Sequence, residues 1–100
     1  MTSNLRRNHR FNCEARVALA WDDELGDIRY GVAKCRDVSV EGFALETMEP
    51  VPIDSYITFR SEQLHLWGRG TVRYCRRVNA KYVLGVSFCA GVRYPTPSVN

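Results

Sequence analysis

The chain has 100 residues, of which 45% are hydrophobic and 25% charged, so it can build one hydrophobic core but not two independent domains. Its longest apolar stretches, such as residues 17–21, are much shorter than the roughly 18 residues that a membrane-spanning helix needs, and no signal peptide is expected. We therefore expect a single soluble domain over residues 1–100 that stays in the cytoplasm and does not insert into a membrane.

The predicted elements are all extended. Residues 1–12 are polar and basic, without helical or alternating periodicity, and are expected to form a flexible tail. From Cys13 to Trp21 every second residue is apolar, which is the pattern of a half-buried strand, and an acidic turn follows at 22–27. Further strands are predicted at 28–36, 43–46, 56–59, 63–77 and 81–89, which places the folded part at 13–90 and a second tail at 91–100.

Six short strands without a convincing amphipathic helix between them favour an all-β fold, a small closed six-stranded antiparallel β-barrel. Gly68 and Gly70 interrupt the long fifth segment and predict a bend or a bulge at a corner of the barrel. Trp21 and Trp67 are expected to fill the core or the mouth of the barrel.

The remaining reactive residue types give no sign of catalysis. Cys13, Cys35, Cys75 and Cys89 are widely spaced and form no C-x-x-C pair, so we expect reduced, buried thiols and no metal site. No Ser/His/Asp set and no glycine-rich phosphate loop at a helix start is recognisable. We therefore predict neither enzymatic activity nor a cofactor.

Two short motifs carry the functional signal. Arg6, Arg7 and Arg10 fall within five consecutive residues that contain no acid, and such a cationic segment attracts phosphates and nucleotides. Arg6 and Arg10 match R-x-x-x-R, and the loop Asp37-Val38-Ser39-Val40-Glu41-Gly42 matches [D/N]-x-S-x-x-G about thirty residues later. Either motif alone would occur by chance in many proteins, whereas their order and spacing on a β-rich chain make the combination specific.

With these motifs the chain resembles the PilZ family of bacterial cyclic di-GMP receptors, and residues 82–88, Tyr-Val-Leu-Gly-Val-Ser-Phe, are similar to its closing G-[V/I]-x-F strand. The resemblance implies a receptor that binds cyclic di-GMP, orders its arginine segment on the bound ligand and signals to an unidentified downstream protein. The residues that it implies in binding are Arg6, Arg7, Arg10, Asp37, Ser39 and Gly42. Members with a further arginine before the first motif arginine tend to hold a stacked ligand pair, and Leu5 at that position predicts one ligand per chain.

These residue types suit such a ligand. An arginine can bind guanine O6 and N7 with both arms of its guanidinium, bridge a phosphate oxygen, or lie flat on a base. Asp37 can accept from the N1 and N2 donors of guanine, with the Ser39 hydroxyl beside it. Gly42 is expected to adopt a positive φ and to let the ligand approach without a Cβ.

Two other functions stay open from the sequence. The chain could be a PilZ-like protein-interaction adaptor that needs no ligand, or a barrel that binds single-stranded nucleic acid on basic and aromatic residues, although we expect no nucleic-acid partner. Taken alone, the arginines also fit a solubilising tail, and the Asp37–Gly42 loop also fits an Asx-type turn whose side chains bond only to nearby backbone.

Overall fold

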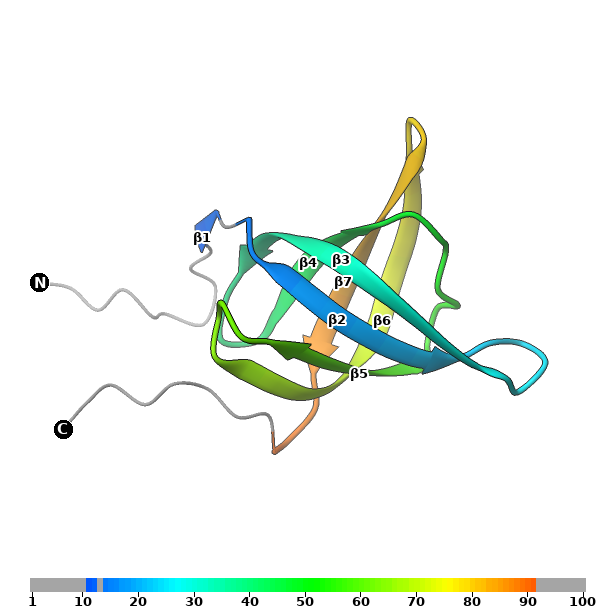
Figure 1. Ribbon diagram of the computed structural model, residues 1–100, viewed down its shortest axis with the longest axis horizontal. Helices are drawn as coiled ribbons and strands as arrows, with labels where there is room; N and C mark the ends of the chain where they lie inside the picture. The colour runs from blue at the N-terminus through cyan, green and yellow to red at the C-terminus, as the bar shows by residue number, and fades with distance from the viewer. Residues whose placement is uncertain (1–10, 13, 92–100) are drawn as a thin grey trace, which may run out of the picture.

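Antiparallel strands make up the regular structure of the chain (Figure 1). The computed structural model describes residues 11, 12 and 14–91, and these residues form seven strands and no helix. The strands are β1 (Phe11–Asn12), β2 (Arg16–Asp22), β3 (Ile28–Val38), β4 (Gly42–Thr47), β5 (Tyr56–Ser61), β6 (Leu66–Val78) and β7 (Lys81–Phe88). Within this part of the chain no helix is long and apolar enough to cross a membrane.

Six of the strands close into a barrel. Neighbouring strands follow the order β3-β2-β5-β6-β7-β4, and β4 pairs back with β3. Closure pairs each of these six strands on both sides, which protects the backbone groups that an open sheet would expose. The short strand β1 is added to β3, in line with β2. The prediction of an all-β, closed six-stranded antiparallel barrel is therefore confirmed.

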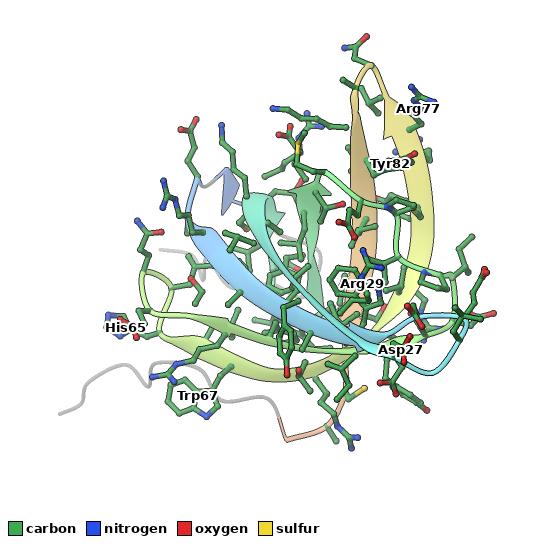
Figure 2. All side chains as sticks on the ribbon, turned by 45° about the vertical axis from the view of Figure 1, so that its right-hand side comes forward. Asp27, Arg29, His65, Trp67, Arg77 and Tyr82 are labelled. Carbon is green, nitrogen blue, oxygen red and sulfur yellow. The ribbon has the colours of Figure 1, made fainter. Side chains whose placement is uncertain are left out.

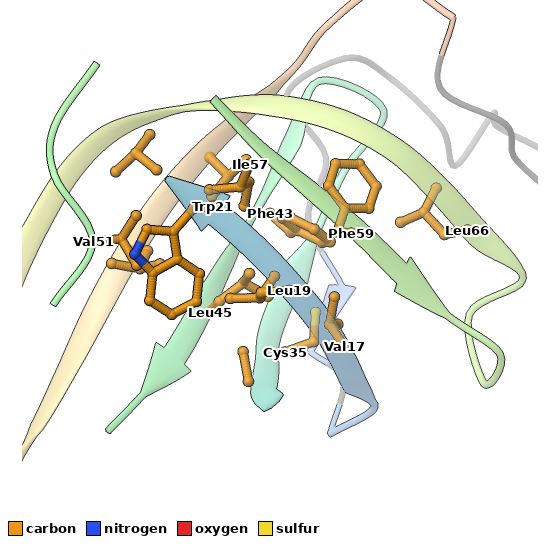
Figure 3. Packing of buried hydrophobic residues seen from close by; sticks show 14 of the residues in the cluster. Val17, Leu19, Trp21, Cys35, Phe43, Leu45, Val51, Ile57, Phe59 and Leu66 are labelled. Carbon is orange, nitrogen blue, oxygen red and sulfur yellow. The ribbon is translucent and has the colours of Figure 1, made fainter. Parts of the chain in front are cut away.

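The core lies inside the barrel (Figure 3). In β2, every second residue from Val17 to Trp21 is buried, as its alternating sequence predicts. Phe43 packs edge-on against two other rings, with centroid distances of 4.8 Å to Phe59 and 4.9 Å to Phe88. These three rings come from β4, β5 and β7, so they hold distant parts of the chain together.

The irregularities of the sheet lie elsewhere than predicted. The pairing of β5 with β6 runs in register through Gly68 and Gly70, so these glycines form no bulge against β5. The bulge of β6 lies between Val72 and Tyr74, opposite β7. A Cβ on Gly70 would come within 2.8 Å of the Ser87 carbonyl oxygen, and this glycine therefore serves close packing between β6 and β7.

Strand β1 was not expected. Phe11 and Asn12 fall inside the segment assigned to the tail, because they show no alternation of their own. They form a strand by pairing with Val38 and Asp37, more than twenty residues away. A contact of this kind between distant segments has no local sequence pattern.

The two tryptophans occupy different environments. Trp21 is 6% exposed and belongs to the core, as expected. Trp67 is 51% exposed, and Figure 2 shows it on the outside of the barrel. Its neighbour Leu66 is buried in the core, so alternation along β6 turns Trp67 outward. The expectation that Trp67 fills the core or the barrel mouth is wrong.

Three of the four cysteines lie among the described residues and are free thiols. Cys35 is fully buried in the core, which confirms its expected structural role. Cys75 and Cys89 are half-buried, so burial of these two is only partial. Cys13 lies outside the described residues.

Candidate ligand-binding site

The loop between β3 and β4 is a tight turn closed by Ser39. The Ser39 amide donates to the Gly42 carbonyl oxygen at 2.9 Å. Its hydroxyl accepts from the Glu41 amide at 3.2 Å and donates to the Gly42 carbonyl oxygen at 3.4 Å. Ser39 is only 7% exposed. Its hydroxyl oxygen has two lone pairs, of which one accepts from the Glu41 amide, so one lone pair remains for a further contact. The local-turn interpretation thus holds for this residue.

Asp37 owes its position to a β-bulge that the sequence did not indicate. The pairing of β3 with β4 shifts between Cys35 and Asp37, which leaves Arg36 as the extra residue. Cys35 belongs to the core and Val38 packs against it, whereas Arg36 is exposed and Asp37 half-buried. Strict alternation would put Asp37 on the same side as Cys35. The bulge therefore turns the carboxylate away from the core.

Gly42 does not have the positive φ that we expected. It is buried and pairs with Ser87 of β7. A Cβ at this position would collide with the Val86 carbonyl oxygen. Gly42 is therefore required for the close approach of β4 to β7, and this packing accounts for the glycine without a ligand.

Strand β1 lies beside the second sequence motif. Phe11 pairs with Val38 and Asn12 with Asp37, so the chain joins the sheet beside the loop that follows β3. In the sequence, Arg10 directly precedes Phe11, and Arg6 lies five residues before Phe11. Arg6, Arg7 and Arg10 themselves lie outside the described residues.

A row of small residues continues from Asp37 along the outward side of the sheet, where Gly42, Ala44 and Gly85 are themselves buried. Asp37 pairs with Ala44, Ala44 with Gly85, and Gly85 with Tyr74. Ala44 faces outward because its neighbours Phe43 and Leu45 lie in the core. We call this surface the β4–β7 shelf and define it as Gly42, Ala44, Gly85 and Ser87.

Tyr74, Arg73 and Arg76 border the β4–β7 shelf. A Cβ on Gly85 would collide with the Tyr74 ring, so the ring lies directly over this glycine. The Arg76 guanidinium carbon lies 4.9 Å from the ring centroid, within cation–π range. Arg73 donates from Nε to the Ser87 hydroxyl at 3.2 Å.

From the sequence, Arg73 and Arg76 fit a solvated strand face or turn from which one arginine could reach the rim of the ligand, and no pattern there indicates Tyr74. The signal that could have found them is Gly85 of the closing strand motif, since a glycine inside a strand often makes room for a neighbour. The facing residue, however, is fixed only by the bulge in β6, which changes the pairing register.

The charges next to the shelf are mixed but partly neutralised. Glu46 lies between two cations, with its Oε2 3.7 Å from Arg36 Nε and its Oε1 3.5 Å from Lys81 Nζ. Arg73 contacts the Ser87 hydroxyl, and Arg76 contacts the Tyr74 ring. The border of the shelf can therefore offer the cations Arg73 and Arg76 and the Tyr74 ring to an anion that carries planar groups.

The fold defines a class of protein, a small closed β-barrel with a row of small residues beside one rim loop. The PilZ domain family model matches residues 4–95, and the chain belongs to the PilZ domain family. PilZ domains are ligand-binding receptor domains. The match includes the arginine segment, the Asp37–Gly42 loop and every described strand. No curated protein matches the chain.

Proposed function

We propose that this protein is a cyclic di-GMP receptor without catalytic activity, which holds one ligand between its arginine segment and the β4–β7 shelf. The observation that supports the proposal is the pairing of β1 with β3, in which the residues that directly follow Arg10 lie beside Val38 and Asp37. In this proposal the two motifs, about thirty residues apart in the sequence, bind one ligand from neighbouring points of the barrel.

The arginines supply most of the binding energy in this proposal. Each charge-assisted hydrogen bond to a phosphate or a guanine contributes about 1.5–3 kcal/mol. Fixing the backbone of the arginine segment costs about 1–2 kcal/mol per residue, so several such contacts have to form together. Three arginines in five positions meet this requirement, because more than half of the residues that are ordered can then form a charge-assisted hydrogen bond.

Asp37 and the shelf provide the selectivity for guanine. The carboxylate can accept from the N1 and N2 donors of one base, a pattern that adenine does not present. The Tyr74 ring fills the space over Gly85, so a base can contact this ring beside the small side chain of Ala44. Stacking of a base on an aromatic side chain contributes about 1–3 kcal/mol in nucleic-acid sites.

In this proposal Ser39 and Gly42 act mainly on the protein. Ser39 holds the loop through its hydroxyl, and its one spare lone pair can accept from the ligand. Gly42 keeps β4 against β7, which sets the position of the shelf. Ordering of the arginine segment on the ligand would then change the surface that a downstream protein contacts.

Calorimetric titration with cyclic di-GMP tests the proposal. We expect one ligand per chain and a loss of affinity of about 10- to 150-fold in Arg10→Ala, the equivalent of one charge-assisted bond. Arg60→Ala is the matched control, because Arg60 is highly exposed on the opposite side of the barrel and should leave binding unchanged. Linear GMP should bind much more weakly than the cyclic dinucleotide.

Two results would contradict the proposal. Equal affinities of Arg10→Ala and the unaltered protein would remove the arginine segment from the site. Absence of binding by a folded protein would favour the adaptor function. A series of salt concentrations and oligonucleotide lengths identifies nucleic-acid binding, whose affinity falls steeply with salt.

A further inference from the structure

A second surface lies on the side of the barrel away from the β4–β7 shelf. In the order of the closed barrel, β2 is three strands from β7, and β5 is three strands from β4. The outer face of β2 and β5 carries a groove of about 990 Å³, whose lining residues come from β2, β3, β5, β6 and the β5–β6 turn. This groove shares none of its lining residues with the shelf.

The groove has a low floor between tall walls. Ala18 and Ala20 of β2 face outward, because the alternate residues of this strand are in the core, and Thr58 of β5 pairs with Ala20. On one side Ala20 pairs with Tyr30 of β3. On the other side Thr58 pairs with Arg69 of β6. Small residues thus lie in the middle strands and large ones in the outer strands.

The next row differs, because its large residue Arg60 stands on the middle strand β5. Ala18 pairs with Arg60, and Arg60 pairs with Trp67. Tyr30 and Trp67, which both line the groove, are 75% and 51% exposed. Figure 2 shows Trp67 and His65 on one side of the barrel, far from Arg77 and Tyr82 on the β6–β7 hairpin. Exposed apolar side chains that line one concave surface are typical of an interaction site.

The two walls differ in chemistry. The β3 wall is formed by the Tyr30 side chain, whereas the β5–β6 wall carries Arg60, Arg69 and Trp67. Arg60 lies 3.5 Å from Glu62, but both side chains are highly exposed, so this ion pair is easily exchanged for another. Arg69 lies over the Tyr56 ring at 5.9 Å. A ligand for this groove needs an apolar surface and carboxylates along one flank.

We infer that the groove is the docking site for an amphipathic α-helix of a partner protein, which carries acidic residues along the flank that faces Arg60 and Arg69. Each of the six barrel strands is paired on both sides, so a partner strand could not extend the sheet, whereas a helix docks through its side chains alone. The apolar residues of the groove fit the apolar face of such a helix, and Arg60 and Arg69 select its acidic flank.

A second copy of the chain and a single-stranded nucleic acid fit less well. A two-fold symmetric contact through this face would bring the Arg60 and Arg69 side chains of both copies into the same interface, where like charges repel. For nucleic acid, the floor of Ala18 and Ala20 offers no side-chain donor, and Glu62 lies beside Arg60. Both remain as outcomes of the test.

Two synthetic helical peptides of about 20 residues test the inference. Both peptides have the same stripe of leucines along one face and lack tryptophan. Along one flank of this stripe, the first peptide carries glutamates and the second carries lysines. We expect the glutamate peptide to bind at least about tenfold more tightly and to shift the fluorescence of the exposed Trp67. The double variant Arg60→Glu/Arg69→Glu should reverse the preference.

Variants of the apolar wall locate the binding surface. Tyr30→Ser should weaken the glutamate peptide by about tenfold or more, as expected for an aromatic contact at the centre of an interface. Tyr74→Ser, in the part of β6 that borders the shelf and outside the groove lining, should leave peptide binding unchanged. Circular dichroism should show that the variants fold, since each altered side chain is exposed.

Four results would overturn the inference. The first two are that neither peptide binds, or that Tyr30→Ser does not alter the affinity for the glutamate peptide. The third is a dimer in sedimentation that Tyr30→Ser disrupts. The fourth is that a poly-thymidine oligonucleotide binds more tightly than the glutamate peptide. Peptide binding is measured without cyclic di-GMP. The groove and the nucleotide site can therefore succeed or fail independently.

Discussion

Gly42→Ala should reduce the stability of the barrel rather than only the affinity for a ligand. The new Cβ would collide with the Val86 carbonyl oxygen, which is backbone and cannot move away by a change of rotamer. Strand β4 would have to shift from β7, and the adjacent Phe43 would move within the core. The change therefore acts on the central packing of the molecule.

The magnitude follows from two opposing effects. Overpacking in a well-packed region costs about 1–3 kcal/mol, and a backbone collision belongs at the upper end. Alanine restricts the unfolded chain more than glycine and returns about 0.4–1 kcal/mol. The net loss in the free energy of unfolding is about 2 kcal/mol, which corresponds to a fall in Tm of roughly 8–16 °C for a chain of this size.

Urea and thermal unfolding followed by circular dichroism measure this loss. Gly31→Ala is the matched control, because Gly31 also lies in a strand without a positive φ, and its Cβ would meet only the Trp21 side chain at 3.4 Å. We expect little change in this control. If Gly42→Ala is as stable as Gly31→Ala and yet loses cyclic di-GMP binding, the packing role assigned to Gly42 is wrong.

Three further predictions concern stability and the arginine segment. Ser39→Ala should lower the free energy of unfolding by about 1–2 kcal/mol in urea, because the buried turn loses both hydroxyl hydrogen bonds; an unchanged value would mean that these bonds contribute nothing. Phe59→Ala should cost about 3–5 kcal/mol in the same assay, since the ring is 3% exposed and contacts Phe43 and Phe88; a loss below 1 kcal/mol would contradict the core described above. Hydrogen exchange at residues 4–12 should slow at saturating cyclic di-GMP, and unchanged exchange would exclude ordering of the arginine segment.

The sequence predicted those features that depend on local pattern. Alternation between Cys13 and Trp21 identified β2, because a strand with one buried face repeats every two residues. The absence of helical periodicity identified the fold class. The order of the two motifs predicts one site, and the pairing of Phe11 and Asn12 with β3 supports that prediction.

The features that the sequence did not predict depend on how distant strands pair. The bulge at Arg36 controls the side on which Asp37 lies, and it exists only relative to β4. The bulge in β6 similarly decides that Tyr74 faces Gly85. Gly42 was assigned a special φ when its actual constraint is a neighbouring carbonyl oxygen. Single-sequence patterns contain no register between strands, and each of these features is a matter of register.

The helix-binding groove and the nucleotide site should act almost independently. Strand β6 contributes Tyr74 to the edge of the shelf and Arg69 to the groove, so it is the direct connection between them. It is paired on both sides and its inward residues belong to one closed core, an arrangement without a second packing to which a ligand could shift it.

We therefore expect saturating cyclic di-GMP to change the affinity of the glutamate peptide by less than about twofold, and linkage requires the same factor for the reverse effect. A coupling of tenfold or more in either titration would show that the barrel itself changes on binding. With weak coupling, the groove would serve as a permanent attachment point, and the ligand-dependent signal would have to come from the arginine segment.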